Sequence, residues 1–276
     1  MREEEIKKAV RDRYADIANK SGRCCLPSAS CCGGDQTVET ISRDIGYRTQ
    51  DLEAVPDGAN LGLGCGNPVA LASLQEGETV VDLGAGAGFD CFLAAREVGQ
   101  NGLVIGVDMT PEMLDKAREN AKKGGYDNVE FRLGEIENLP VADNTADIII
   151  SNCVINLSPD KRRVFQEAFR VLKPGGRLMV SDIVLLKELP AALKESIDAY
   201  VGCVAGAVMK DDYIDAIDKA GFQEVRIIDE TLFPVKDFIG YANALEIVEC
   251  TDVLMEMARE LGTAIASIKV HAVKGE

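Results

Sequence analysis

Long apolar runs and a secretion signal are both missing from this chain of 276 residues. No apolar segment approaches the roughly 20 residues that a membrane-spanning helix requires. The charged first residues, Met1–Glu5, lead into no apolar core of the kind that a signal peptide carries. We therefore expect a cytoplasmic protein with no membrane partner.

Positive charge and histidine are both scarce. The 30 lysines and arginines are outnumbered by 46 aspartates and glutamates, which gives a formal net charge of −16. A nucleic-acid binder needs clustered positive charge for its phosphate contacts, so we expect no nucleic-acid partner. The single histidine, His271, lies near the C-terminus, and we interpret it as a packing or surface residue rather than a catalytic one.

Cysteine, in contrast, is abundant, with nine residues in the chain. Disulfide frameworks are typical of secreted proteins, and the sequence shows no secretion signal. The cysteines are then buried small apolar residues, ligands of a metal or metalloid, or redox-active thiols. Their positions along the chain have to distinguish these roles.

A glycine-rich turn organises the rest of the sequence. The short β-branched run at the start of residues 79–83, which leads into Asp82, predicts a strand, and Phe89 begins a predicted helix. Between them, Gly84, Gly86 and Gly88 leave bare backbone against which a ligand can lie. Phe89 takes the place of the third glycine of a dinucleotide site, which disfavours a nicotinamide-dependent oxidoreductase.

Strands and helices alternate around this turn, which indicates an α/β fold with a parallel sheet and helices on both faces. The expected strands are 79–83, 103–107, 129–133, 146–151, 177–182, 223–230 and 266–272. The expected helices are 4–19, one or two turns within 36–55, 69–74, 89–98, 110–123, 158–172, 190–201 and 211–220, with further helix after 230.

Asp108 follows the second expected strand, where a carboxylate can accept both ribose hydroxyls of a nucleoside that lies on the glycine turn. The alternative is a structural residue at the start of the next helix. After the third expected strand, residues 134–137 offer an apolar side chain and polar groups, which suits the adenine ring of such a nucleoside.

These segments resemble the class I S-adenosylmethionine-dependent methyltransferases over about residues 76–185. The resemblance implies S-adenosyl-L-methionine as the cofactor and a Rossmann-like, mostly parallel doubly wound sheet with an antiparallel last strand. It also implies an N-terminal cysteine-rich extension and helical insertions on the substrate side. The implied cofactor-binding residues are Asp82, Gly84, Gly86, Gly88, Asp108, Met109, Glu135, Ile136 and Asn152.

Three cysteines come from three separate segments that can converge on one site. Cys65 lies in a glycine-rich loop before the first strand of the sheet, Cys153 at the carboxyl end of the fourth, and Cys203 after the fifth. Each can instead be a buried small apolar residue. The glycines beside Cys65 and Cys203 favour close approach of another group over core packing.

The segments around these cysteines, Asn60–Pro68, Ser151–Lys161 and Tyr200–Cys203, resemble the arsenite methyltransferases. The likeness runs through most of residues 10–230. It implies that Cys65, Cys153 and Cys203 are catalytic residues that bind arsenic(III), supplied as arsenite or its thiol conjugates, in arsenic detoxification. Soft thiolates are the ligands that such a thiophilic centre prefers. Three sulfur ligands leave the arsenic lone pair free to attack the sulfonium methyl group, and no general base is needed.

Four further cysteines, Cys24, Cys25, Cys31 and Cys32, lie in a Pro-, Ser- and Gly-containing loop. The resemblance implies that one of them, for which we choose Cys32, forms a disulfide with a site cysteine and so keeps arsenic trivalent. Thioredoxin or glutathione would then reduce that disulfide. Additional arsenic capture or a zinc-like cluster is the alternative, although adjacent cysteines are poor joint ligands of a tetrahedral ion.

The remaining cysteines carry less information. Cys91 begins the helix after the glycine turn, where packing beside the cofactor is favoured over a reactive thiol, and Cys250 has no identified partner. We divide the chain into an N-terminal helix and cysteine-rich lead-in, 1–60, and a methyltransferase domain, 61–276. Arsenic-binding elements are expected around 60–68 and 186–210, and the protein is expected to be a monomer.

Two other functions remain open at this level. One is a methyltransferase for a small organic acceptor, such as a quinone or sterol precursor, with merely buried cysteines. The other is a non-catalytic thiol-based metalloid binder or redox sensor. The motifs from Asp82 to Asp108 count against the second, because a pure binder does not need them.

Overall fold

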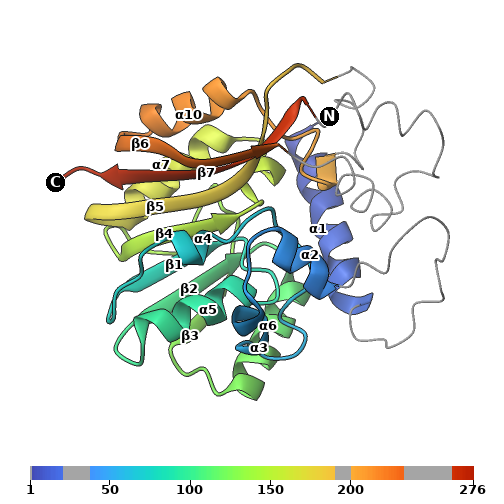
Figure 1. Cartoon of the computed structure of the whole chain (residues 1–276), viewed down its shortest axis with the longest axis vertical. Coiled ribbons are helices and arrows are strands. Elements are labelled where there is room, and N and C mark those ends of the chain that lie inside the picture. The colour runs from blue at the N-terminus through green and yellow to red at the C-terminus, as the bar shows by residue number, and fades with distance from the viewer. Residues whose placement is uncertain (1, 21–37, 190–199, 233–262) are drawn as a thin grey trace.

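The sheet that carries the site has seven strands, in the order β3-β2-β1-β4-β5-β7-β6. The computed structural model describes residues 2–20, 38–189, 200–232 and 263–276 (Figure 1). The strands are β1 (Thr79–Leu83), β2 (Leu103–Asp108), β3 (Val129–Leu133), β4 (Ala146–Asn152), β5 (Leu172–Leu185), β6 (Phe222–Leu232) and β7 (Ile265–Lys274). β1 to β5 pair in parallel, whereas β7 is antiparallel to both β5 and β6. The predicted Rossmann-like fold with an antiparallel last strand is confirmed.

The helices lie close to their predicted positions. They are α1 (Glu3–Lys20), α2 (Val38–Asp44), α3 (Thr49–Glu53), α4 (Pro68–Leu71), α5 (Phe89–Val98), α6 (Pro111–Gly124), α7 (Lys161–Val171) and α10 (Lys210–Lys219), with a 3-10 turn, η1 (Ile155–Leu157). α7 begins later than expected because the Asp160 side chain caps it by accepting a hydrogen bond from the Arg163 amide at 3.0 Å. α4 ends early, and Ser73 beyond it adopts a left-handed φ of 48°.

β5 is longer than the expected 177–182. Its partner β7 continues the ladder from Arg177 opposite Val273 to Leu185 opposite Ile265. Alternation along each strand sends neighbouring side chains to opposite faces of the sheet. Val81 packs in one core cluster with residues of α7 and α10, and Val80 packs in another with residues of α5. Both faces of the sheet are therefore covered by helices, as a doubly wound fold requires.

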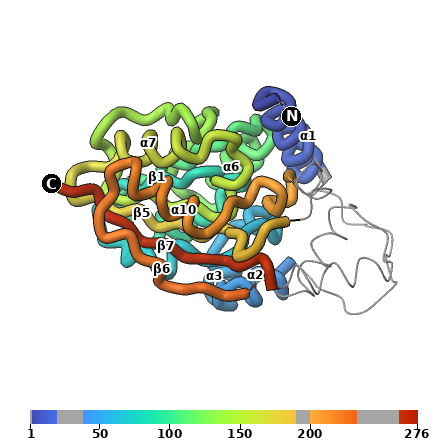
Figure 2. Tube along the Cα trace, turned by 90° about the horizontal axis from the view of Figure 1, so that it is seen from above, coloured from blue at the N-terminus to red at the C-terminus, as the bar shows by residue number. Residues whose placement is uncertain are grey.

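α1 lies at the end of the sheet opposite to the chain's C-terminus, in both views of the molecule (Figures 1 and 2). Because β7 is antiparallel to β5, this is the end at which the parallel strands finish. Ligands of such sheets bind at the carboxyl ends of the strands, so α1 covers the expected ligand edge. Among the described residues no helix has the length and apolar character to cross a membrane.

Several predictions fall on residues that the structure does not describe. The cysteine-rich loop with Cys24, Cys25, Cys31 and Cys32 lies within 21–37, and Cys250 lies within 233–262. Most of the helix expected at 190–201, the expected substrate-side insertion, and the further helix after 230 lie outside the described residues as well. The division at residue 60 remains a prediction.

Candidate active site

One cavity lies over the carboxyl ends of the parallel strands, and the empty space between its walls, open solvent included, amounts to about 1090 Å³. Its wall combines α1, the glycine-rich loop before α4, the turn after β1 and the segments after β2, β3 and β4. Cys153 and Cys203 line the same cavity. The predicted cofactor turn and two of the predicted arsenic ligands therefore share one cavity.

The glycine turn after β1 needs its glycines for two different reasons. Gly86 has a left-handed φ of 53° and open space where a side chain would be, so the backbone faces the cavity. A side chain at Gly84, in contrast, would collide with Val154. Bare backbone beside an open volume is what the sequence pattern predicts for a bound ligand.

Asp108 holds this turn in place. Its carboxylate accepts hydrogen bonds from the backbone amides of Gly86 at 2.9 Å and Thr110 at 2.8 Å. The ribose-binding and helix-entry interpretations are therefore compatible, because the same carboxylate lines the cavity and caps the segment that enters α6. Burial raises the pKa of Asp108, and these amide hydrogen bonds oppose that rise.

Two more buried carboxylates, Asp82 and Asp90, line the same cavity. The buried thiol of Cys91 donates a hydrogen bond of 3.1 Å to Asp82, so Cys91 contacts the carboxylate from inside the core. Burial and the nearby Asp90 raise the pKa of Asp82 well above its usual value, and burial raises the pKa of Asp90 to about 6. This concentration of acidic groups suits a positively charged ligand.

Most of the predicted cofactor residues lie in this wall, but Gly88 and Glu135 do not. A side chain at Gly88 would collide with Phe92 and Phe131, so this glycine serves packing inside the fold. Met109, Ile136 and Asn152 line the cavity. The Glu135 carboxylate instead forms an ion pair of 2.7 Å with Lys7 of α1. The sequence could not place that lysine. Glu137, which also pairs with Lys7 at 3.1 Å, lines the cavity instead.

Asn152 connects the cavity wall to the loop that carries Cys65. Its side-chain oxygen accepts a hydrogen bond of 3.0 Å from the Cys65 amide. Its side-chain nitrogen lies within hydrogen-bond distance of the Gly66 carbonyl at 2.8 Å, the Tyr47 hydroxyl at 2.8 Å and the Asp90 carboxylate at 3.1 Å. The Tyr47 hydroxyl also donates to Asp90 at 2.6 Å. No local sequence pattern distinguishes Tyr47, whereas Asp90 could have been noticed as the acidic residue directly after Phe89.

The three predicted thiols are buried and belong to one packed cluster. The Cys203 thiol donates to the Cys153 carbonyl at 3.0 Å. Hydrogen bonds with the thiols of Cys203 and Cys65, together with burial, raise the pKa of Cys153 well above its usual value. Both Cys153 and Cys203 have left-handed φ angles, 58° and 62°, which non-glycine residues rarely adopt. Such backbone outliers concentrate at functional sites.

The glycines beside these cysteines allow the close approach that the sequence predicts. A side chain at Gly66 would collide with Ser181 of β5, and one at Gly206 would collide with the backbone of Asn156. These contacts press the Cys65 loop and the segment after Tyr200 against the strand ends. Separate segments of the chain thereby bring their thiols to one place.

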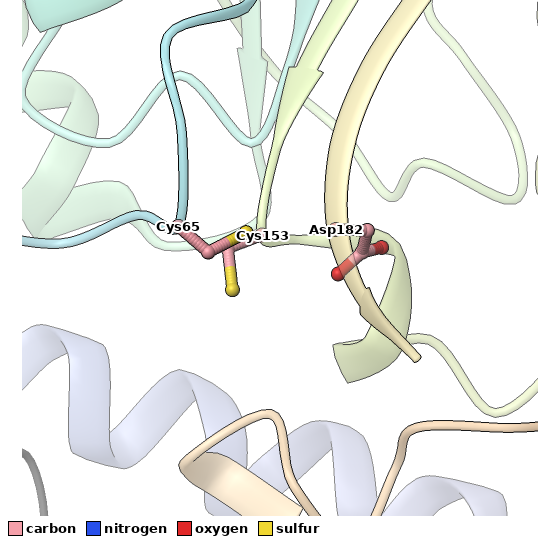
Figure 3. A group of neighbouring side chains, drawn as sticks. All are labelled: Cys65, Cys153 and Asp182. Carbon is pink, nitrogen blue, oxygen red and sulfur yellow. The ribbon is translucent and has the colours of Figure 1, made fainter. Parts of the chain in front are cut away.

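Two residues at the thiols were not predicted. Tyr14 of α1 lines the cavity, and its pKa is raised well above the usual value by burial and by the nearby Cys203, Cys153 and Asp108. Asp182 of β5 is buried, and one of its oxygens lies within 4.8 Å of the sulfur atoms of Cys65 and Cys153 (Figure 3). Burial raises the pKa of Asp182 to about 7. In the sequence it is simply the end of a strand, with no motif around it.

Comparison with known proteins agrees with this geometry. The model of a methyltransferase domain matches residues 74–221. An arsenite methyltransferase of Halobacterium salinarum is 53% identical over 231 residues, 81% of this chain and 59% of that protein. The arsenite methyltransferase of Mus musculus is 31% identical over 267 residues, 93% of this chain and 69% of that protein.

A solved structure gives the same assignment. CrArsM, an arsenic(III) S-adenosylmethionine methyltransferase from Chlamydomonas reinhardtii, superimposes with a TM-score of 0.63 at 33% identity, over 86% of this chain and 73% of that one. The chain spans 59% and 69% of the two curated relatives, so both are considerably longer. Together with the methyltransferase domain and the three converging thiols, these similarities show that the chain belongs to the arsenite methyltransferase family.

Proposed function

We propose that this chain transfers methyl groups from S-adenosylmethionine to trivalent arsenic held by Cys65, Cys153 and Cys203. The observation that carries the proposal is the shared cavity, whose wall contains the glycine turn together with Cys153 and Cys203. A methyl donor on the turn and a thiol-bound acceptor would then lie within one cavity. Holding two reactants in line is a large source of rate enhancement.

The residues of the cavity suit the proposed cofactor. The backbone at Gly86 faces open space, Asp108 offers a carboxylate for the ribose, and Ile136 gives an apolar surface for the adenine. Asp82 and Asp90 add two buried carboxyl groups, and a cationic molecule beside them would favour their ionised forms. When bound, S-adenosylmethionine supplies a methyl group on a positively charged sulfur.

The thiols suit the proposed acceptor. Arsenite, As(OH)₃, exchanges its three hydroxyl groups for three cysteine sulfurs and releases three molecules of water. The arsenic lone pair then forms a bond to the methyl carbon, and the carbon–sulfur bond of the sulfonium breaks to leave S-adenosylhomocysteine. No proton has to be removed from arsenic, which agrees with a cavity wall that contains no histidine among the described residues.

Methyl transfer leaves arsenic formally pentavalent, so a further transfer needs two electrons. We propose that two cysteines supply them by forming a disulfide, with Cys32 as one partner, and that thioredoxin or glutathione reduces this disulfide. Arsenite or its thiol conjugates are the proposed substrates, and detoxification of arsenic is the proposed role.

Speciation of the arsenic products tests the proposal. The purified protein is incubated with arsenite, S-adenosylmethionine and a thiol reductant, and the products are separated by chromatography with mass detection. We expect methylated arsenicals from the unmodified protein and none from Cys153→Ser or Cys203→Ser, with cofactor binding retained. Cys91→Ser is the matched control, because Cys91 is an equally buried thiol that contacts Asp82 rather than the arsenic site.

The same experiment addresses the two alternatives. A methyltransferase for a small organic acceptor would produce no methylated arsenical, and its turnover would survive replacement of the three cysteines. A thiol-based metalloid binder would bind arsenite tightly without methyl transfer. Full activity of both serine variants would contradict the three-thiol site.

A further inference from the structure

Asp182 completes a group of three ligands with two of the site thiols. The sulfur atoms of Cys65 and Cys153 and one carboxylate oxygen of Asp182 all lie within 4.8 Å of one another. Figure 3 shows that they come from three segments: the loop before α4, the residue after β4, and β5. All three residues are buried, and Cys203 is not a member of this group.

The Asp182 carboxylate is held in a defined orientation. Oδ1 accepts hydrogen bonds from the Asn156 side chain at 2.8 Å and the Ile183 amide at 2.9 Å, and Oδ2 accepts one from the Tyr213 hydroxyl at 3.0 Å. Carboxylates that ligate metals are typically fixed by such outer hydrogen bonds. A carboxylate oxygen has two lone pairs, and Oδ2 accepts no second hydrogen bond from the described residues.

Asp182 also has no direct cationic partner. Within the described part of the chain no lysine or arginine nitrogen lies within 4.0 Å of its carboxylate, and the Lys161 ammonium acts on it only from a distance. Buried carboxylates are normally paired with a cation or coordinated to a metal. A cation bound between Asp182 and the two thiols would replace the carboxyl proton and pair with the ionised carboxylate.

We propose that Cys65, Cys153 and Asp182 bind a thiophilic divalent cation, with Zn²⁺ as the best match. Zinc takes cysteine sulfur at about 2.3 Å and carboxylate oxygen at about 2.0–2.2 Å in tetrahedral geometry. Two thiolates on one tetrahedral zinc therefore lie about 3.8 Å apart, so atoms already within 4.8 Å need to move by only about 1 Å. Water takes the fourth position, because the Cys203 sulfur is not among the ligand atoms that lie within 4.8 Å of one another.

The two ions would use different third ligands. Arsenic(III) is soft and, in the proposed function on which this comparison rests, takes its third thiolate from Cys203. Zinc also accepts a carboxylate oxygen, which Asp182 offers. Zinc binding replaces the protons of the Cys65 and Cys153 thiols and releases both to solvent, without any oxidation. Zinc and arsenite therefore compete for two of the same sulfur atoms.

The test is a zinc titration against a chromophoric chelator, made on the reduced full-length chain. All variants carry serine at positions 24, 25, 31 and 32, which removes the other cluster of candidate thiols. Asp182→Asn is expected to weaken zinc binding by about tenfold or more and to leave arsenite binding within about threefold. Cys203→Ser is expected to weaken arsenite binding by about tenfold or more and to leave zinc binding within about threefold. Cys153→Ser is expected to lose the binding of both zinc and arsenite.

Cys91→Ser is the matched control, because it removes a buried thiol that lies outside this group, and its zinc affinity should stay within about threefold of the background. Thermal unfolding and cofactor binding verify that each variant folds. Unchanged zinc affinity in Asp182→Asn or in Cys153→Ser overturns the site. If Asp182→Asn does not fold, the absorption spectrum of the background protein, with serine at positions 24, 25, 31 and 32, is measured with Co²⁺ bound. The absence of a thiolate-to-cobalt charge-transfer band would overturn the site. Failure of the background protein itself to bind arsenite, with the zinc pattern intact, would instead contradict the proposed function alone.

Discussion

The side-chain oxygen of Asn152 accepts a hydrogen bond of 3.0 Å from the backbone amide of Cys65, which lies 87 positions earlier in the chain. The same side chain reaches Asp90 in the wall of the cofactor cavity. Asn152 therefore joins the part of the site proposed for the methyl donor to the part proposed for arsenic. A shift of the Asn152 side chain therefore alters contacts in both parts of the site.

Replacing Asn152 by alanine should loosen the Cys65 loop. The amide of Cys65 and the carbonyl of Gly66 would lose buried partners, and each unsatisfied group costs about 1–3 kcal/mol. We expect a loss of about 2–4 kcal/mol in the free energy of unfolding, measured in urea, and a clear drop in arsenic methylation.

Asn128→Ala is the control for this prediction. The Asn128 side chain also donates hydrogen bonds to two backbone carbonyls, those of Ala95 and Gly99, but it directly precedes β3, at the amino ends of the parallel strands, whereas Cys153 follows the carboxyl end of β4. It should lower stability without lowering methylation at saturating substrate. Equal losses of activity in the two variants would mean that Asn152 acts only through stability.

Asp108→Ala should weaken cofactor binding more than arsenite binding. The change removes the acceptor of the Gly86 and Thr110 amides and the proposed ribose acceptor. Hydrogen bonds to a charged group contribute about 1.5–3 kcal/mol each, so we expect affinity for S-adenosylmethionine to fall about 100-fold. Calorimetric titration of the cofactor measures this, and a parallel arsenite titration should show little change. A cofactor affinity equal to that of the unmodified protein would remove Asp108 from the site.

The protein's stability should depend on pH through Asp90. Burial raises its pKa to about 6 in the folded protein, compared with 3.8 for a free aspartate. Between these values the folded state binds more protons than the unfolded state, so this group's contribution to stability is complete below about pH 4 and declines until about pH 6. The shift corresponds to on the order of 3 kcal/mol.

Asp90→Asn should therefore flatten that dependence. The amide stays neutral at every pH and can still accept from Tyr47 or Asn152. Urea unfolding from pH 4 to pH 8 should give a smaller loss of stability with rising pH for the variant than for the unmodified protein. Identical slopes would indicate that Asp90 does not titrate in this range.

Lys7 should hold α1 against the cavity. Its ammonium pairs with Glu135 at 2.7 Å and Glu137 at 3.1 Å, and only 20% of its side chain is exposed. We expect Lys7→Ala to increase hydrogen exchange in α1 and the rate of cofactor release, with a stability change of no more than about 1 kcal/mol. High salt should reduce the difference from the unmodified protein.

Lys8→Ala is the control, because Lys8 is an exposed neighbour on the same helix. It should leave exchange and release rates unchanged. If both variants behave alike, the ion pairs do not control α1.

Local patterns were sufficient to predict the elements of the sheet. Residues 79–83 begin with a β-branched run and are followed at once by three alternating glycines, a pattern typical of a strand and a tight turn, and the structure has β1 and the turn there. The antiparallel last strand came from the family resemblance, because periodicity alone does not give the direction of a strand. The length of β5 was underestimated, since it depends on pairing with β7, which lies far along the chain.

What the sequence alone determined is the chemistry available: soft thiols at three separated positions, an acid after the second strand, and backbone free of side chains at the turn. Which of these groups meet was decided only by the tertiary structure. Lys7 pairs with Glu135, Asn152 accepts a hydrogen bond from the Cys65 amide, and a carboxylate oxygen of Asp182 lies within 4.8 Å of the sulfurs of Cys65 and Cys153. The physical reason is that each contact depends on the order of the strands in the sheet or on the position of α1 over the strand ends. Neither can be predicted from the local hydrophobic pattern around the residues in contact.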